Sequence, residues 1–380
     1  MFKLQFLKDW LMVASAFILA GSTFGIWASR IPVFVIRFDL SPKELGVLLF
    51  LLAFGAILSF ACSGFLSDRY GAVRISKILA CLCLIAFICL PLARDLLSFG
   101  FFLFLFGMFN GGLDISMNVW ASEIQRRYEK QVLSSFHAMF SFGAGIGAFL
   151  GFSAASNEMS IEANFFIGAF CLIPVLVLIL SSSWQSERKK SDRFFKQVAL
   201  PKKSIIGLGV IAFCSSLGEG GVADWSALFL VLVTQVSQAD AALGFGVFSF
   251  SMFVFRLMGD KIIIKLGKEL TGRISALTAF LGSVLVILSG HYLVILLGLI
   301  FMGAGYAILI PVCFSRAAED TTVTPGAAIA SVSTFGYSGF LLGPPILGLI
   351  ADYTSIRVIF VILMLLTGVI FAMSKQLRAH

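Results

Sequence analysis

Charged residues are scarce in this sequence of 380 residues. Asp, Glu, Lys and Arg together make up 13% of it, well below the roughly one quarter that is usual in soluble domains. Hydrophobic residues make up 59%, and the mean hydropathy is +1.00. This composition excludes an ordinary soluble domain and is typical of an integral membrane protein.

Cysteine and proline are also few, with seven and nine residues. So little proline does not fit a disordered, proline-rich chain. The cysteines lie inside apolar runs without the spacing of a zinc site or a disulfide framework, so we expect no metal and interpret them as small buried hydrophobic residues. They are Cys62, Cys81, Cys83, Cys89, Cys171, Cys214 and Cys313.

Sequence motifs of common enzymes are missing as well. The chain has no GxxxxGK[ST] nucleotide loop, no HExxH and no GxSxG, which are the signatures of ATP-driven, metallopeptidase and hydrolase chemistry. The longest polar stretch, residues 184–204, is too short for a soluble catalytic domain. We therefore expect neither an enzyme nor a cofactor.

Long apolar runs are abundant instead. A bilayer core about 30 Å thick requires roughly 20 apolar residues in a helical span, and the sequence contains twelve such runs, while the alternating pattern of an outer-membrane barrel is absent. The sequence therefore predicts an all-α polytopic membrane protein with twelve transmembrane helices. The runs are 10–29, 44–66, 76–93, 97–122, 134–155, 162–183, 205–230, 241–259, 273–290, 293–315, 326–350 and 355–374.

Basic residues are distributed unequally between the connections. Most of the 28 Lys and Arg residues fall on the side that carries the N-terminus, and the opposite side holds only Arg30, Arg37, Lys43, Arg94 and Arg357. Because positive charge marks cytoplasmic connections, both termini are expected in the cytoplasm. The formal net charge of +8 is thus a topology signal, and we do not expect nucleic-acid binding.

The polar stretch 184–204 divides the chain into two halves of six spans, predicted as bundles 1–183 and 205–380. The halves resemble each other: SFGAG at 141–145 matches TFGYS at 334–338, and Asp68 matches Asp260. A parallel duplication of this kind indicates two pseudo-symmetric six-helix bundles with a binding site near the midplane.

A glycine-rich charged segment, GFLSDRYGAVR at 64–74, connects the second and third spans, and RLMGDKIIIKLGK at 256–268 occupies the same place in the second half. Both resemble the loop signature of the major facilitator superfamily. The resemblance implies a cytoplasmic gate held by ion pairs, although these charges also fit a simple topology marker. The matching residues are Gly64, Asp68, Arg69, Gly71, Arg74, Arg256, Asp260 and Lys261.

Further segments, including GGLDISMNVWASEIQRR (111–127) and EGGVADWSALFL (219–230), resemble a bacterial branch of that superfamily related to the fucose permeases. The resemblance implies the major facilitator fold, a monomer in the bacterial inner membrane, and a central cavity lined by spans one, four, seven and ten. It does not specify the solute.

Polar residues concentrate on spans four and seven. Asn110, Asp114 and Asn118 recur at intervals of four and therefore share one helix face. An ionised acid inside the bilayer is costly unless it is paired or faces water. We therefore expect Glu219, Asp114 and Asp224 to carry protons and the two amides to contact the solute. Asp114 could instead hold the fourth span against the fifth near Ser134 or His137.

Arg30 and the aromatic residues of the predicted cavity spans are further candidates. Arg30 fits an ion pair with Asp224, a clamp on an anionic or hydroxyl-rich solute, or a cation at the membrane interface. Trp27 and Trp225 are candidates for stacking on a solute. Tyr306 is a candidate hydrogen-bonding residue, and Pro311 predicts a kink in the tenth span.

Together these features predict a secondary active transporter that moves a small polar solute, such as a sugar or another metabolite, by alternating access coupled to protons. Its partners would be the solute, protons and membrane lipid. Two alternatives remain open at this point: export of a metabolite or drug by proton antiport, and a non-transporting sensor or scaffold with the same fold.

Overall fold

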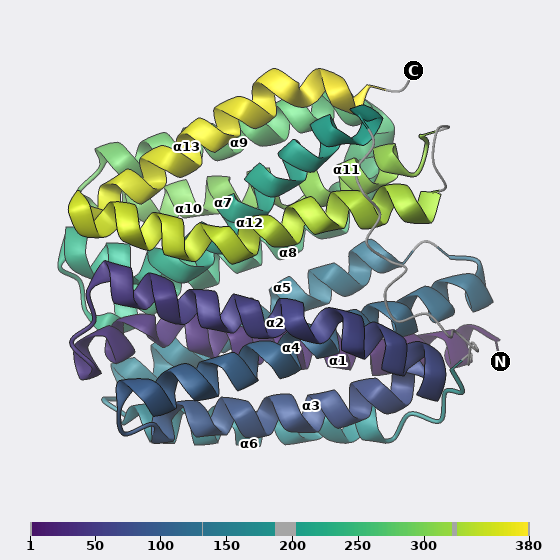
Figure 1. Cartoon of the computed structure of the whole chain (residues 1–380), viewed down its shortest axis with the longest axis horizontal. Helices are drawn as coiled ribbons and strands as arrows, with labels where there is room; N and C mark the ends of the chain where they lie inside the picture. The colour runs from purple at the N-terminus through teal and green to yellow at the C-terminus, as the bar shows by residue number, and fades with distance from the viewer. Residues whose placement is uncertain (1, 131, 187–202, 321–324, 379–380) are drawn as a thin grey trace.

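The structure is a computed structural model that describes residues 2–130, 132–186, 203–320 and 325–378. Twelve helices in this part of the chain are long and apolar enough to cross a membrane, which confirms the predicted number. Figure 1 shows them in two groups, with α1 to α6 on one side and α7 to α13 on the other.

The first group contains six membrane-spanning helices and one short 3-10 helix. Several of them begin with a side-chain cap. The hydroxyl of Ser41 accepts from the backbone N–H of Glu44, and Asp95 likewise accepts from Ser98, which satisfies amide groups that a helix start leaves free. The helices are α1 (Phe2–Arg37), α2 (Pro42–Tyr70), α3 (Ala72–Cys89), η1 (Leu90–Leu92), α4 (Leu96–Tyr128), α5 (Leu133–Ser156) and α6 (Ile161–Leu180).

In the second group the tenth span is divided into two helices. Pro311 lacks the N–H that would bond to the carbonyl of Ala307, and the helix is interrupted between Tyr306 and Leu309, which confirms the predicted kink. The elements are α7 (Lys203–Thr234), α8 (Gln238–Leu266), α9 (Lys268–Leu288), α10 (Tyr292–Tyr306), α11 (Leu309–Ala317), α12 (Pro325–Tyr353), α13 (Ile356–Met373) and η2 (Ser374–Leu377).

Both chain ends lie at the same end of the helices (Figure 1), which we call the termini face; the opposite end is the far face. The predicted linker 184–204 begins on the termini face, and its residues 187–202 lie outside the described part of the chain. The start of the linker is held to the first bundle, because Trp184 Nε1 donates to Glu123 Oε2 at 2.8 Å and the backbone N–H of Val73 donates to Ser186 Oγ at 3.1 Å.

The outer surface of the bundles is apolar. Leu97, Phe170, Ile264 and Leu288 are among its most exposed large side chains, as expected where lipid replaces water. Cys62 and Cys171 are exposed as well, so the expectation that every cysteine is buried was wrong. A cysteine side chain is apolar enough for lipid, and an apolar helix gives no periodicity that separates its inner face from its outer face.

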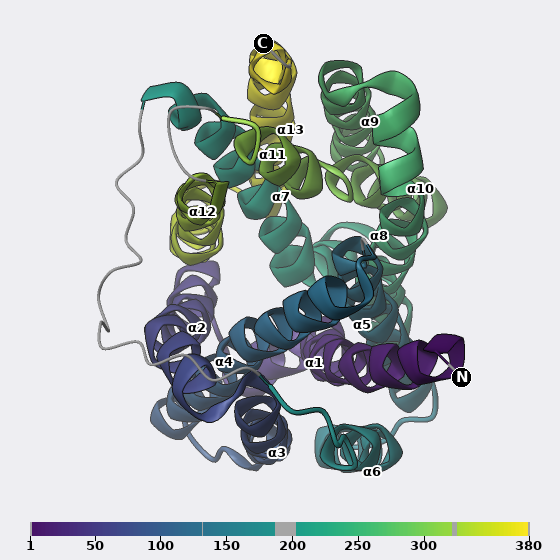
Figure 2. The same ribbon diagram turned by 90° about the vertical axis from the view of Figure 1, so that its right-hand side faces the viewer.

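The most extensive contacts between the two bundles are made by two pairs of helices. Figure 2 views the protein from the termini face, and α2 lies beside α12 while α5 lies beside α8. On the far half of α2, a Cβ added to Gly46 would lie 2.8 Å from the carbonyl oxygen of Pro344, and one added to Gly348 would lie 2.6 Å from that of Pro42. Glycine therefore allows these two backbones to approach closely.

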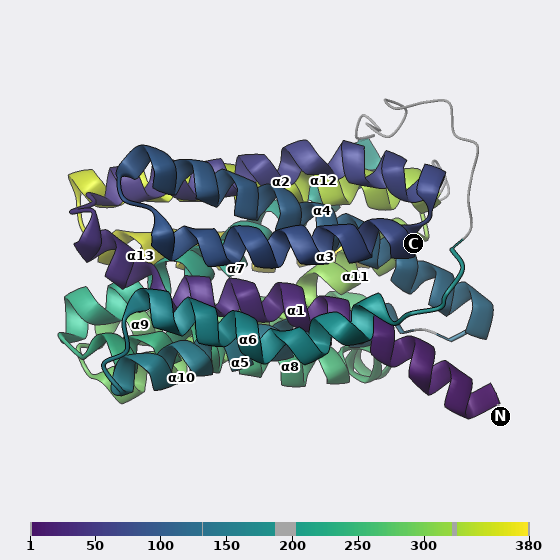
Figure 3. The ribbon, with the colours of Figure 1, turned by 90° about the horizontal axis from the view of Figure 1, so that it is seen from below.

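The first turns of α1 extend past the neighbouring helices on the termini face (Figure 3). They are attached to α4 by a polar contact, since Tyr128 donates its hydroxyl to Asp9 Oδ2 at 2.6 Å. The Gln5 amide, on α1 itself, donates to the same carboxylate. The contact between Tyr128 and Asp9 therefore holds the start of the chain against α4, on the face where the linker begins.

Candidate functional site

An intramembrane ion pair joins α7 to α8. Arg256 Nη2 lies 3.1 Å from Oε1 and 3.2 Å from Oε2 of Glu219. Their side chains are only 11% and 19% exposed. A carboxylate at such depth needs a nearby cation or a proton, and Arg256 supplies the cation here.

This contact corrects the prediction that Arg256 belongs to the cytoplasmic gate motif. Arg256 precedes Asp260 by four residues, which places it about 6 Å deeper along the helix. Its guanidinium therefore faces Glu219 inside the bundle and not the loop between α8 and α9. The proton candidate Glu219 thus has a partner that the sequence did not suggest.

The same guanidinium also reaches the other bundle. Arg256 Nη1 donates to Ser141 Oγ at 2.6 Å and to the backbone carbonyl of His137 at 3.4 Å, both on α5. A single side chain therefore connects α5, α7 and α8. We call the set Ser141, Glu219 and Arg256 the arginine bridge.

Asp114 on α4 makes a second connection between the bundles. The hydroxyl of Tyr337, on α12, donates to Asp114 Oδ2 at 3.2 Å, and the Asn118 amide donates to Oδ1 at 3.1 Å. The alternative that Asp114 binds Ser134 or His137 is therefore wrong: its partner in the other helices lies on α12. The Tyr337 ring also contacts Phe60 of α2, with centroids 4.4 Å apart.

The two amides of the α4 stripe are half-buried, as is Asp114 between them. Asn118 is folded back on its own helix, since Nδ2 also donates to the Asp114 carbonyl at 2.8 Å. Asn110 donates weakly to the Ala20 carbonyl of α1 at 3.4 Å, so its amide is less constrained than that of Asn118.

Arg30 and Asp224 are both buried, with 4% and 9% exposed surface. No ion pair joins them in the described residues, so the predicted pair is absent from this arrangement. Arg30 lies beside α5 instead: a Cβ added to Gly151 would lie 3.6 Å from Arg30 Cδ, an ordinary van der Waals distance, and would overlap the hydroxyl of the neighbouring Ser29. Asp224 makes no hydrogen bond within the part of the chain that is described.

The aromatic candidates lie in the packed core. Trp27, Trp225 and Tyr306 have at most 1% exposed surface, and the Trp27 ring contacts Phe34 and Phe99 with centroids 5.4 and 5.9 Å away. In this arrangement they pack between helices, and their contact with a solute stays a prediction. Apolar residues predominate on both sides of each ring in the sequence, so no local pattern indicates which way the rings turn.

Near the termini face, the first gate segment begins in the last turns of α2, which contain Gly64, Asp68 and Arg69. A tight turn follows the end of this helix. Gly71 has φ 95°, which favours glycine, and its N–H donates to the Ser67 carbonyl at 2.9 Å. Arg74 follows in the first turn of α3 and is exposed.

The second gate segment contacts the opposite bundle by a hydrogen bond. Ser134 Oγ, on α5, donates to Asp260 Oδ1 at 3.3 Å, while the neighbouring Lys261 is exposed. Within the described residues neither Asp68 nor Asp260 forms an ion pair, so the latch of ion pairs is not formed in this arrangement.

Sequence reasoning missed Ser141 and Tyr337 as partners of the buried charges. Both lie in the repeated segments SFGAG and TFGYS, which had indicated the duplication. Each of these two segments contains a hydroxyl side chain that can bind a buried charge. This shared feature was a signal in the sequence from which the two partners could have been predicted.

Four similarities to known proteins add to this geometry. Residues 12–322, and in a second match residues 208–375, match the Major Facilitator Superfamily. The chain is 37% identical over 374 residues to an uncharacterized transporter, y4wD, of Sinorhizobium fredii, covering 98% of this chain and 99% of that one.

It is also 27% identical over 354 residues to an uncharacterized MFS-type transporter of Yersinia pestis, covering 93% and 92% of the two chains. Among solved structures, a point mutant of the nucleoside transporter NupG superposes with a TM-score of 0.79 at 12% identity, covering 98% of this chain and all of that one. That likeness concerns the fold.

Proposed function

The chain belongs to the Major Facilitator Superfamily, and we propose that this membrane transporter moves a small polar solute by proton-coupled alternating access. It would lie in a bacterial inner membrane as a monomer. We place both termini in the cytoplasm, because the termini face carries most of the basic residues and positive charge marks cytoplasmic connections. The bilayer lipid, the solute and protons are its proposed partners.

The arginine bridge is the observation that carries this proposal. Arg256 binds Glu219 within its own bundle and Ser141 in the other one, so a movement of α5 away from α8 removes part of its hydrogen bonding. A proton on Glu219 removes the charge that Arg256 neutralises. Protonation and bundle movement therefore act on the same side chain, and coupling between them is reciprocal.

Asp114 and Tyr337 supply a second element of the same kind on the other pair of helices. A protonated Asp114 no longer offers a charged acceptor to Tyr337, which weakens the contact between α4 and α12. We propose Glu219 as the main proton site and Asp114 as the second. Asp224 is the third candidate, since an ionised carboxylate without a partner is costly at such depth.

The solute would lie near the midplane, between the α4 stripe and α7, as in transporters built from duplicated bundles. Asn110 is the best candidate for direct contact, because among the described residues its amide makes a single hydrogen bond, and that bond is long. A scaffold without transport has no need of an intramembrane ion pair between helices, so the arginine bridge favours a transporter over that alternative.

Purified protein in liposomes tests this proposal. With a pH gradient imposed across the membrane, the wild type should accumulate at least one of a panel of labelled sugars, amino acids and nucleosides. Glu219→Gln should lose accumulation but retain exchange of the same solute, because exchange does not require net proton movement. Glu129→Gln, at an exposed position after α4, is the matched control.

A Glu219→Gln variant with wild-type accumulation would exclude Glu219 as the proton site. If no solute responds to the gradient in the wild type, proton coupling itself is wrong. The direction of accumulation relative to the gradient separates uptake from export by antiport.

A further inference from the structure

Arg30 has more hydrogen-bonding capacity than its surroundings use. The residue is buried, with 4% of its surface exposed, and neither Nε nor Nη1 has a hydrogen-bond partner among the described residues. A guanidinium carries five N–H donors, and burying such donors without acceptors is costly. An acceptor that arrives from outside the chain would remove this cost.

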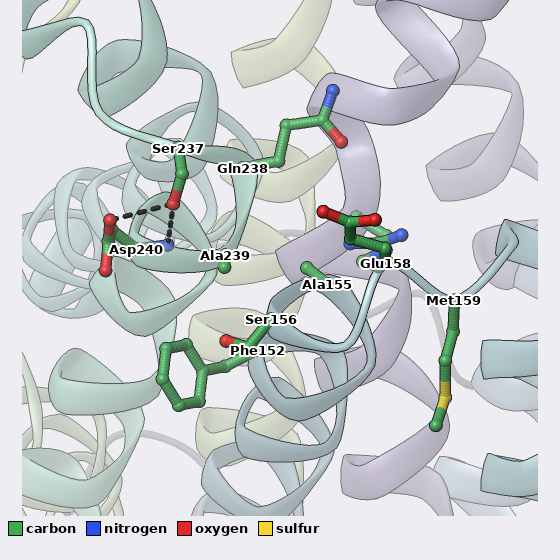
Figure 4. Close-up of a pocket in the computed structure, with 10 residues that line it drawn as sticks. Phe152, Ala155, Ser156, Glu158, Met159, Ser237, Gln238, Ala239 and Asp240 are labelled. Atoms are coloured by element: carbon green, nitrogen blue, oxygen red, sulfur yellow. Dashed lines mark hydrogen bonds between the residues drawn. The ribbon is translucent and has the colours of Figure 1, made fainter.

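Arg30 lines a cavity of about 530 Å³ on the far face. The first bundle contributes the end of α5 and the connection to α6, and the second bundle contributes the start of α8 (Figure 4). The volume is within the range of small-molecule sites, roughly 300 to 1,000 Å³. The cavity therefore lies between the two halves that must move during alternating access.

The charges around the cavity have both signs. Besides the buried cation Arg30, the lining contains two carboxylates, Glu158 and Asp240, which Figure 4 shows at different sides of the pocket. Asp240 is fixed in place: Ser237 Oγ donates to its Oδ2 at 2.7 Å and accepts from its backbone N–H at 3.1 Å. Glu158 is exposed and makes no ion pair with a described residue.

We propose that this cavity binds a small zwitterion, with its carboxylate on Arg30 and its ammonium group between Glu158 and Asp240. A carboxylate matches the planar fork of a guanidinium. A phosphate or sulfate fits less well, because two rim carboxylates repel a second negative charge. A zwitterion complements both the buried cation and the two carboxylates.

The inference rests on the proposed function, since the cavity would be the site at which a solute enters or leaves the transporter on the far face. The central polar residues do not specify a substrate class, whereas the charges around this cavity favour a zwitterion. Because the cavity is built from both bundles, the affinity for its occupant would also change when the bundles move relative to each other.

Binding to the full-length protein in detergent tests the site without any transport. Titration calorimetry should use glycine, β-alanine and 4-aminobutyrate, which vary the distance between the two charges, with acetate, ethylamine and inorganic phosphate as single-sign probes. We expect saturable binding of at least one zwitterion, tighter than that of every single-sign probe at equal ionic strength.

Arg30→Gln should weaken the binding of that zwitterion by about tenfold or more, the loss expected for a charged hydrogen bond. Glu158→Gln, at an exposed position, should weaken zwitterion binding without weakening acetate binding, because only the ammonium group loses a partner. Arg94→Gln is the control, since Arg94 is exposed on the same face and does not line the cavity.

The site is overturned if no zwitterion binds, if acetate or phosphate binds as tightly as the best zwitterion, or if both Arg30→Gln and Glu158→Gln bind like the wild type. If Arg30→Gln cannot be purified, Glu158→Gln decides alone. Glu219→Gln should bind the zwitterion in detergent even where it has lost gradient-driven accumulation, so the failure of this site and the failure of the proposed proton coupling are separate results.

Discussion

Arg256 on α8 and Ser141 on α5 are joined across the two bundles by a hydrogen bond of 2.6 Å. The other terminal nitrogen of the same guanidinium, Nη2, donates to Glu219 of α7. This arrangement gives one arginine two roles: it neutralises an acid inside its own bundle and ties that bundle to the other one. The variants below separate the two roles.

Ser141→Ala should loosen the contact between α5 and α8 while leaving the ion pair in place. A hydrogen bond to a charged group contributes about 1.5 to 3 kcal/mol, so the population in which the two helices are apart should rise about tenfold or more. Hydrogen–deuterium exchange of the residues near 137–141 and 256–260 should become faster.

Ser153→Ala is the control for that variant. Ser153 lies on the same helix, and its hydroxyl makes no hydrogen bond in the described structure, so its replacement should leave exchange in both segments unchanged. Equal exchange in Ser141→Ala and Ser153→Ala would contradict a stabilising role for the bridge.

The Arg256–Glu219 pair predicts a difference between single and double variants. Arg256→Gln leaves the buried Glu219 carboxylate without its cation. We expect the free energy of unfolding to fall by about 3 kcal/mol, the low end of the range for broken buried pairs, because both side chains keep some exposure. The melting temperature in detergent should fall in Arg256→Gln and recover partly when Glu219→Gln is added. Lys261→Gln, exposed on the same helix, should melt like the wild type, and equally unstable single and double variants would argue against the pair.

Tyr337→Phe isolates the contact between Asp114 and α12. It removes the hydroxyl but retains the ring beside Phe60. The effects of Tyr337→Phe and Asp114→Asn on stability should not add, and a double-mutant cycle should give a coupling of about 0.5 to 3 kcal/mol. Additive effects would show that the hydroxyl and the carboxylate act independently.

Helix contacts within the first bundle depend on Gly107. A Cβ at this position of α4 would overlap the carbonyl oxygen of Leu52 on α2, whereas one at Gly368 of α13 would meet no atom within 4 Å. Gly107→Ala should therefore lower the melting temperature. Gly368→Ala should leave it unchanged or raise it, because alanine has the higher helix propensity by about 1 kcal/mol. Equal effects of the two substitutions would contradict the close contact of α2 and α4.

The sequence was sufficient to predict the twelve spans and the break at Pro311, because apolar length and a missing N–H act locally. It was insufficient for the partner of Glu219. Arg256 belongs to a segment that resembles a loop motif. Only the structure shows that Arg256 lies one helical turn deeper than Asp260 and on the face of α8 that contacts α7.

The orientation of Trp27 and Trp225 was unpredictable for a related reason. Periodicity reveals the inner face of a helix when its outer face is polar, and in a membrane both faces are apolar. The two rings turned out to pack in the core. Only the polar residues of α4 carried a periodic signal, and that signal did not identify Tyr337 as the partner from α12.

Proton exchange on solute binding tests the central claim, that protonation of Glu219 is coupled to the solute, most directly. Purified wild-type protein in weakly buffered detergent receives the solute found to accumulate in liposomes, and a pH indicator records protons taken up or released. The account predicts a measurable proton change in the wild type and in Glu129→Gln, and none in Glu219→Gln. A proton change of the same size in Glu219→Gln, or no change in the wild type, would contradict it.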